Sequence, residues 1–215
     1  MGVDFRTVAE ARAYVGGLSE PSKMPGLGTS TPASECITGS KLREIPGSVC
    51  HGCYAMKNRY TFTGVQTALK RRLERLKDPL WVPAMVRALA GQEWFRWYDS
   101  GDLQGEWHLR NIIEVCRQTP TVRHWLPTRE YKMVRNVLAK TEVPPNLCIR
   151  LSEHMVDEIG PAVKLAAKLN VTASGVAAKK ELGGRKCPAL SQGNSCGTCR
   201  SCWDKEVPVV IYPAH

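Results

Sequence analysis

The chain has 215 residues, of which 43% are apolar, and its 30 Lys and Arg against 20 Asp and Glu give a net charge of +10. This size excludes a small domain that depends on disulfide staples, so we expect one domain, or one domain with appendages. The sequence contains neither a signal-peptide pattern nor an apolar run of membrane-spanning length. We therefore expect a cytoplasmic protein with no contact to a membrane.

The positive charge favours nucleic acid or a nucleotide as a partner, because cations that neutralise phosphates release counterions. Much of the charge lies between residues 57 and 77, where Glu74 is the single acid. The basic residues of this segment are Lys57, Arg59, Lys70, Arg71, Arg72, Arg75 and Lys77. The alternative interpretation is an ordinary solvated face of a basic helix.

The predicted elements begin with a helix around residues 5–15 and an irregular lead-in loop over residues 21–32, which is rich in Pro, Gly, Ser and Thr. Helices and strands then alternate. Further predicted helices cover residues 65–76, 82–90, 103–118, 130–140 and 159–169, and predicted strands cover residues 94–98, 122–126, 147–151 and 171–176. This alternation indicates βαβ units and a parallel sheet.

We therefore expect an α/β fold, a parallel (β/α) partial or small TIM-like barrel with a C-terminal cysteine-rich segment. An open doubly wound sheet is the alternative. The expected organisation is an N-terminal helix and lead-in loop over 1–35, a barrel core over 36–180, and a cysteine-rich cluster-binding segment with a terminal strand over 181–215.

Polar residues follow three of the predicted strands at the point where each ends. These clusters are Asp99, Ser100, Gly101 and Asp102; Thr128, Arg129 and Glu130; and Ser152, Glu153 and His154. Because sites in parallel α/β folds are built from loops at the carboxyl ends of strands, the clusters are expected to line one mouth. The alternative for Asp102 and Glu130 is that they only cap helices.

Four of the nine cysteines lie in the tail as Cys187-Pro, Cys196, Cys199 and Cys202. In a reducing cytoplasm we expect metal ligands rather than disulfides. The run C-x2-C-x2-C with a remote Cys-Pro is typical of [4Fe–4S] binding, whereas zinc sites use paired C-x2-C knuckles, so we favour the cluster and keep zinc as the alternative. Arg185, Lys186 and Arg200 are expected to offset the charge of the thiolates.

Three further cysteines form Cys36-x13-Cys50-x2-Cys53 near the start. Three ligands leave one coordination position free, which is typical of a catalytic metal site. Two arrangements stay open: two separate clusters, or termini that converge on one shared cluster. Cys116 and Cys148 lie within a predicted helix and strand and are expected in the core.

The string from Cys50 to Ala55, Cys-His-Gly-Cys-Tyr-Ala, with Cys36 upstream, resembles the cysteine motif of radical S-adenosylmethionine (SAM) enzymes. The resemblance implies a (β/α) barrel, a [4Fe–4S] cluster on the three cysteines, SAM at the open iron, and an external electron donor. It implies a cofactor-binding role for Tyr54, Ser100 and Gly101. It also implies that Asp99 and Asp102 contact the polar end of SAM or the substrate, and that Arg129, Glu130 and Arg150 contact the substrate.

Over residues 23 to 203 the chain resembles the phage family called gene product 88. The resemblance rests on Cys50-x2-Cys53-Tyr-Ala, on the segment from Phe95 to Leu103, on Thr128-Arg129-Glu130 and on the tail cysteines. If the protein is encoded by a phage, the expected location is the cytoplasm of the host.

Three functional hypotheses follow. The first is a radical-SAM-like iron–sulfur enzyme, or a descendant of one, that acts on nucleic acid or a nucleotide. The second is a non-SAM iron–sulfur protein, either a redox partner or a nucleic-acid-binding module. The third is a protein in which zinc at both sites is purely structural.

Overall fold

The computed structural model describes residues 5–214, and its centre is a single sheet in which all six strand pairings are parallel. The strand order is β1-β2-β3-β4-β5-β7-β6. The strands are β1 (Leu27–Thr29), β2 (Trp94–Trp97), β3 (Arg123–Thr128), β4 (Leu147–Ser152), β5 (Thr172–Ala177), β6 (Arg185–Lys186) and β7 (Val209–Pro213).

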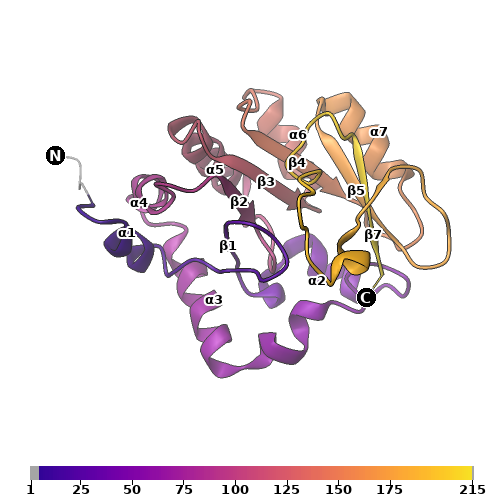
Figure 1. Cartoon of the computed structure of the whole chain (residues 1–215), viewed down its shortest axis with the longest axis horizontal. Helices are drawn as coiled ribbons and strands as arrows, with labels where there is room; N and C mark the ends of the chain where they lie inside the picture. Colours follow the sequence, from indigo (N-terminus) through magenta and orange to yellow (C-terminus); the bar gives the residue numbers. More distant parts are fainter. Residues whose placement is uncertain (1–4, 215) are drawn as a thin grey trace.

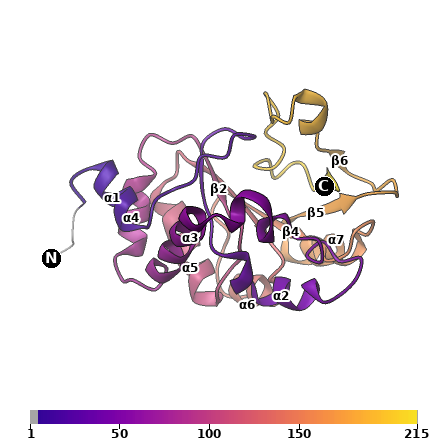
Figure 2. The same cartoon turned by 90° about the horizontal axis from the view of Figure 1, so that it is seen from below.

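The connections between the strands carry most of the helices. The α-helices are α1 (Val8–Tyr14), α2 (Ile37–Arg43), α3 (Thr63–Arg75), α4 (Trp81–Ala88), α5 (Glu106–Gln118), α6 (Tyr131–Leu138) and α7 (Gly160–Leu169). Because strands are added in chain order from β1 to β5, right-handed crossovers place the helices between them on one face. In Figures 1 and 2, α5, α6 and α7 lie on one face of the sheet, and the C-terminal segment lies over the other.

The expected α/β fold with a parallel sheet is confirmed, and its strand order excludes the doubly wound alternative. A doubly wound sheet reverses its order at a switch point, whereas here the first five strands follow the chain. Within residues 5–214, β1 and β6 are the edges of an open sheet. The arrangement is therefore that of a parallel sheet in barrel order whose edges do not meet.

Two of the differences from the expectation lie in the segment before β2. Residues 21–32 were expected to be an irregular loop, but Leu27–Thr29 pairs with β2 as the first strand. The helix Ile37–Arg43 was not expected at all. Both are short and contain glycine, so neither has a long enough hydrophobic period to be recognised. The proposed division into segments 1–35, 36–180 and 181–215 stays a prediction.

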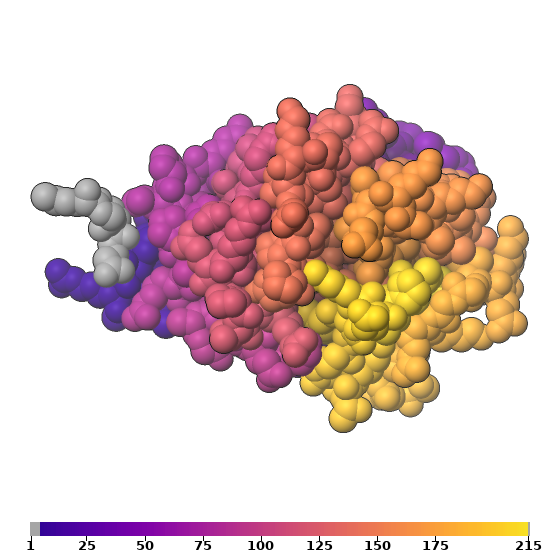
Figure 3. Space-filling view, turned by 90° about the horizontal axis from the view of Figure 1, so that it is seen from above, coloured from indigo at the N-terminus to yellow at the C-terminus, as the bar shows by residue number. Residues whose placement is uncertain are grey.

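Alternation along β2 separates the two faces of the sheet. Phe95 and Trp97 are fully buried among the core residues on the helix side. Trp94 and Trp125 belong instead to a smaller cluster with Trp203 from the C-terminal segment. Figure 3 shows the yellow C-terminal residues lying against the body of the molecule. The buried positions expected for Cys116 and Cys148 are confirmed.

Part of the basic segment is used to hold α1 in place. Arg71 donates through Nη2 to the Gly16 carbonyl (3.1 Å), and Arg72 donates through Nε to the Gly17 carbonyl (2.9 Å). These cations satisfy carbonyls that follow the C-terminal end of α1. The solvated-face interpretation is thus too simple, because Arg72 is buried.

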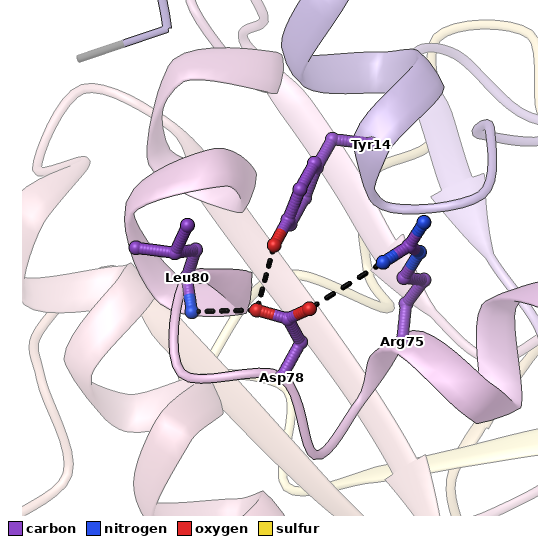
Figure 4. Close-up of polar contacts among 4 residues, drawn as sticks. All are labelled: Tyr14, Arg75, Asp78 and Leu80. Carbon is purple, nitrogen blue, oxygen red and sulfur yellow. Dashed lines mark hydrogen bonds and ion pairs between the residues drawn. The ribbon is translucent and has the colours of Figure 1, made fainter. Parts of the chain in front are cut away.

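The turn between α3 and α4 is fixed by Asp78 (Figure 4). Its Oδ1 accepts from the Tyr14 hydroxyl (2.7 Å) and from the Leu80 amide (2.9 Å), and its Oδ2 pairs with Arg75 (3.4 Å). The Tyr14 bond is the main cause of the lowered pKa of Asp78. Asp78 therefore joins α1 to the start of α4. No helix described between residues 5 and 214 has the length and apolar character to cross a bilayer.

Candidate metal centres

The segment that carries Cys36, Cys50 and Cys53 crosses the carboxyl ends of β2, β3 and β4. Glu130, just after β3, bonds to Thr38. The Val49 amide donates to the carbonyl of His154 after β4 (2.9 Å), and the Tyr54 hydroxyl donates to the carbonyl of Asp99 after β2. The three cysteines thus lie at the edge of the sheet where α/β folds build their sites.

We call Cys36, Cys50 and Cys53 the open set. Gly39 on α2 lies between two of its sulfurs: a Cβ at this position would be 3.6 Å from the Sγ of Cys36 and 3.6 Å from that of Cys50. Burial raises the pKa of the Cys36 thiol, and the neighbouring Asp102, Cys50 and Cys53 raise it further. Cys53 likewise raises the pKa of Cys50, after burial, so all three thiols are electrostatic neighbours.

Arg129 is the cation with the largest effect on the pKa of Cys36 and of Cys50 in the open set. It opposes the raised pKa of Cys36 and of Cys50. Its own position is fixed by its main chain, which donates to Asp102, and by its Nε, which donates to the Glu153 carbonyl (3.3 Å). The structure thus places the predicted Arg129 beside the thiols, where it stabilises their charged form.

Asp102 is buried, and both of its carboxylate oxygens are in use. Oδ1 accepts from the Thr128 hydroxyl (2.6 Å) and the Leu103 amide (2.8 Å), and Oδ2 accepts from the Arg129 amide (2.8 Å). Burial raises its pKa to about 6, against the effect of these donors. Asp102 therefore joins the loops after β2 and β3, and its oxygens face protein groups.

Glu130 and Glu153 both bind the start of a helix. Glu130 Oε1 accepts from the Thr38 amide (2.7 Å) and Oε2 from the Thr38 hydroxyl (2.8 Å), at the first turn of α2. Glu153 Oε2 accepts from the Ala162 amide at the start of α7 (3.0 Å). A carboxylate near a helix N-terminus satisfies free amides and the positive end of the dipole. The capping alternative for Glu130 thus has direct structural support, but on a helix that the sequence did not reveal.

Asp99 differs from its neighbours, since its Oδ1 is buried without a hydrogen-bond partner in the described structure. Its Oδ2 receives a long bond from the Tyr60 hydroxyl (3.4 Å). Ser100 donates through its hydroxyl to the Thr31 carbonyl (3.0 Å). Gly101 has φ +84°, and a Cβ there would lie 2.0 Å from the Thr31 hydroxyl oxygen, so glycine is required.

The predicted cofactor-binding residues Tyr54, Ser100 and Gly101 thus lie close together, but they have different contacts. Ser100 and Gly101 are packed against Thr31, and Ser100 uses both its hydroxyl, which donates to the Thr31 carbonyl, and its carbonyl, which accepts from the Thr31 amide (3.1 Å). Tyr54 directly follows Cys53 and reaches Asp99. Among the acids predicted at the mouth, Asp99 has a carboxylate oxygen that accepts no hydrogen bond within the described structure.

The tail cysteines form a second, separate set. We call Cys187, Cys196, Cys199 and Cys202 the tail set, and all four line one small cavity next to Trp203. Cys187 raises the pKa of Cys196 and of Cys202, after burial in each case. Burial raises the pKa of Cys199, but its hydrogen bonds with Ser201 and the nearby Arg185 and Arg200 outweigh burial and leave that pKa lowered.

Arg150 anchors the tail set to the sheet. Its side chain is fully buried and donates to five main-chain carbonyls, four of them in the C-terminal segment. The acceptors are the carbonyls of Ala173, Ser201, Cys202, Asp204 and Val207. Arg150 was expected to contact substrate, but its guanidinium is occupied by these carbonyls. Its partners are over 50 residues away in sequence for four of the five bonds, so no local signal could have revealed them.

The thiol geometry bears on the kind of metal. All nine cysteines are free, and among residues 5–214 no three His, Cys, Asp or Glu side chains are arranged to hold a metal ion. A zinc ion with Zn–S bonds of about 2.3 Å needs sulfurs about 3.8 Å apart. A [4Fe–4S] cluster uses one thiolate at each iron and needs wider spacing. The kind of metal therefore stays a prediction.

Comparison with known proteins gives one family. The sequence model of the family described as gene product 88 matches residues 9–205, which extends the expected resemblance at both ends. No curated protein and no solved structure matches the chain.

Proposed function

The chain belongs to the gene product 88 family, and from its two separate sets of thiols we propose that it is an iron–sulfur protein with two [4Fe–4S] clusters and a radical-SAM-like activity. The observation that carries the proposal is the open set: three thiols, and no fourth cysteine, over the carboxyl ends of β2, β3 and β4. The other six cysteines are the four of the tail set and the buried Cys116 and Cys148.

Each set has the donors that its proposed cluster needs. The tail set supplies four thiols around one cavity, which suits a closed cluster. The open set supplies three, so a cluster held there would keep one iron free for a ligand such as SAM. When bound, that cluster would supply the electron that cleaves SAM, and the electron would come from an external donor.

The protein residues around the open set would orient the ligand. Arg129 lies beside Cys36 and Cys50 and would offset the charge of the thiolates. Asp99 has a buried acceptor without a partner, which would accept a hydrogen bond from the ammonium group of SAM. Glu130 acts indirectly, because it fixes α2 and thereby Cys36. Asp102 acts in the same way through the loop that carries Arg129.

The proposed substrate class is nucleic acid or a nucleotide. Its support is the part of the basic segment that is exposed and not tied to α1 or Asp78, which consists of Lys57, Arg59, Lys70 and Lys77. Affinity for nucleic acid should fall steeply with salt, because each neutralised phosphate releases counterions. A flat salt response would remove this substrate class and leave the cluster proposal standing.

The test uses three anaerobically purified proteins: the natural sequence, a variant with Cys36, Cys50 and Cys53 changed to Ala, and Cys116→Ala as the control for loss of a buried cysteine. We expect the triple variant to lose about half of its iron and sulfide. SAM should change the electron paramagnetic resonance spectrum of the natural protein and yield 5′-deoxyadenosine on reduction, but not in the triple variant. Full loading with no response to SAM would instead support the non-SAM iron–sulfur alternative, and zinc without iron would support the structural one.

A further inference from the structure

Arg96 of β2 lies on the face of the sheet that carries the tail set. Its Nε donates to the Tyr98 carbonyl (2.8 Å), and its Cζ lies 4.5 Å from the centroid of the Trp125 ring. The bond and the stacked ring hold the planar guanidinium in one orientation. Arg96 was not among the residues selected from the sequence.

On one side Arg96 faces the loops of the open set. Burial alone would lower the pKa of Arg96, and the carboxylate of Asp99 in the loop after β2 acts against this. Arg96 also forms a side-chain hydrogen bond with Tyr54. Tyr54 in turn donates to the Asp99 carbonyl. The guanidinium thus holds together the segment after Cys53 and the loop after β2.

On the other side Arg96 faces the tail set. Burial raises the pKa of the Cys202 thiol, and Arg96 is one of the groups that oppose this and favour the thiolate form. The Sγ of Cys202 lies 3.2 Å from the Tyr212 hydroxyl, and the Tyr212 ring packs near Trp125 with centroids 6.5 Å apart. Arg150 is also near Cys202, but its donors are committed to main-chain carbonyls. Arg96 therefore contacts the segment after Cys53 through Tyr54 and contributes a cation to the tail set through Cys202.

We propose that Arg96 is a positioning residue shared by the two cysteine sites, which holds the Tyr54 and Asp99 loops at the open set and stabilises the reduced cluster at the tail set. The second role rests on the proposed function. Reduction adds an electron, and hence negative charge, to a cluster, so a nearby cation favours the reduced form and raises the potential. Loss of the Arg96 charge should lower it.

The positioning role is tested on metal-free protein by amide hydrogen exchange. Arg96→Lys keeps the positive charge. Its single ammonium group cannot reach both the Tyr98 carbonyl and Tyr54, as the planar fork of the guanidinium does. We expect exchange at least tenfold faster in residues 53–60 than in the natural protein. The control is Arg123→Lys, which removes a guanidinium that lies over Trp94 on the same sheet, 5.6 Å from the ring centroid. Unchanged exchange in the Arg96 variant would overturn the positioning role.

The tail role is tested in the background with Cys36, Cys50 and Cys53 changed to Ala, where only the tail set can be loaded. The solution is held at the midpoint potential of the parent protein, and the ratio of oxidised to reduced cluster is measured. In Arg96→Gln we expect this ratio to rise at least tenfold, which corresponds to a shift of the midpoint potential by about −59 mV for one electron. Arg96→Lys should lie closer to the parent, and Arg123→Gln should match it. If Arg96→Gln does not fold, Arg96→Lys decides the question. A ratio equal to the parent's supports the role of the Arg96 charge at the tail set, and a tenfold change in the ratio overturns it.

The two possible failures are distinguishable. A parent without iron and sulfide overturns the proposed function, and the tail role of Arg96 falls with it, while the exchange measurement on metal-free protein still decides the positioning role. A fully loaded Arg96→Gln variant with the parent's potential overturns the tail role alone.

Discussion

The carboxylate of Glu130 accepts hydrogen bonds from both the amide (2.7 Å) and the hydroxyl (2.8 Å) of Thr38, a residue 92 positions away in the sequence. This pair joins the end of β3 to the first turn of α2, directly after Cys36. The position of a proposed cluster ligand therefore depends on an acid from another part of the fold.

Glu130→Gln should weaken this junction, because it replaces two charge-assisted hydrogen bonds by neutral ones, with the Thr38 hydroxyl now accepting from the amide, and removes the negative charge at the start of α2. We expect a loss of about 1–3 kcal/mol in the free energy of unfolding, measured by denaturant titration. Iron at the open set should fall with it. Glu142→Gln, at an exposed position, is the control and should behave as the natural protein does. Equal stability of the two variants would contradict the assigned role of Glu130.

Gly39→Ala should impair the open set without unfolding the protein. Alanine favours a helix by about 1 kcal/mol over glycine, but the new methyl would lie 2.9 Å from the Cβ of Cys36 and 3.6 Å from two sulfurs. We expect the iron content to drop toward that of the tail set alone. Gly64→Ala on α3 is the matched control, since a Cβ there has no neighbour within 4 Å. Full iron in Gly39→Ala would show that this space is not needed.

Arg150→Lys should release the C-terminal segment from the sheet. Lysine has one ammonium group and cannot serve five carbonyls, so several buried acceptors lose their donor. We expect a loss of about 3 kcal/mol or more in the free energy of unfolding and faster amide exchange in residues 199–207. Arg110→Lys, which alters only an exposed pair with Glu106, should change neither. Protected amides in the Arg150 variant would argue against the anchor.

The Asp78 site predicts a pH dependence of stability with a definite sign. The pKa of Asp78 is lowered in the folded protein, chiefly by the Tyr14 hydrogen bond, so its contribution is present above the unfolded pKa of about 3.9. It is lost as the pH falls through the lower, folded pKa. In urea titrations, Tyr14→Phe should be less stable than the natural protein at pH 7, and the difference should shrink below about pH 4. A difference that stays constant down to pH 2 would contradict this account.

The sequence predicts the centre of the fold because β2, β4 and β5 are apolar runs between amphipathic helices. It does not predict β1 or α2, which are too short to show a period. The grouping of seven cysteines into a set of three and a set of four could be predicted from their spacing alone. Their surroundings could not, because Glu130 meets Thr38, and Arg150 meets Cys202, only after the chain has folded. Asp102 and Asp99 look alike in sequence, and only the structure shows that both carboxylate oxygens of Asp102 accept hydrogen bonds whereas Oδ1 of Asp99 is buried without a partner.

The most direct test of the central claim is the iron and acid-labile sulfide content of anaerobically purified protein, compared between the natural sequence and variants that lack either the open set or the tail set. Two independent [4Fe–4S] sites predict about eight iron atoms per chain, and about four in each variant. About four iron atoms in the natural protein, lost from both variants alike, would show one shared cluster and contradict the account. Zinc without sulfide would contradict it more completely.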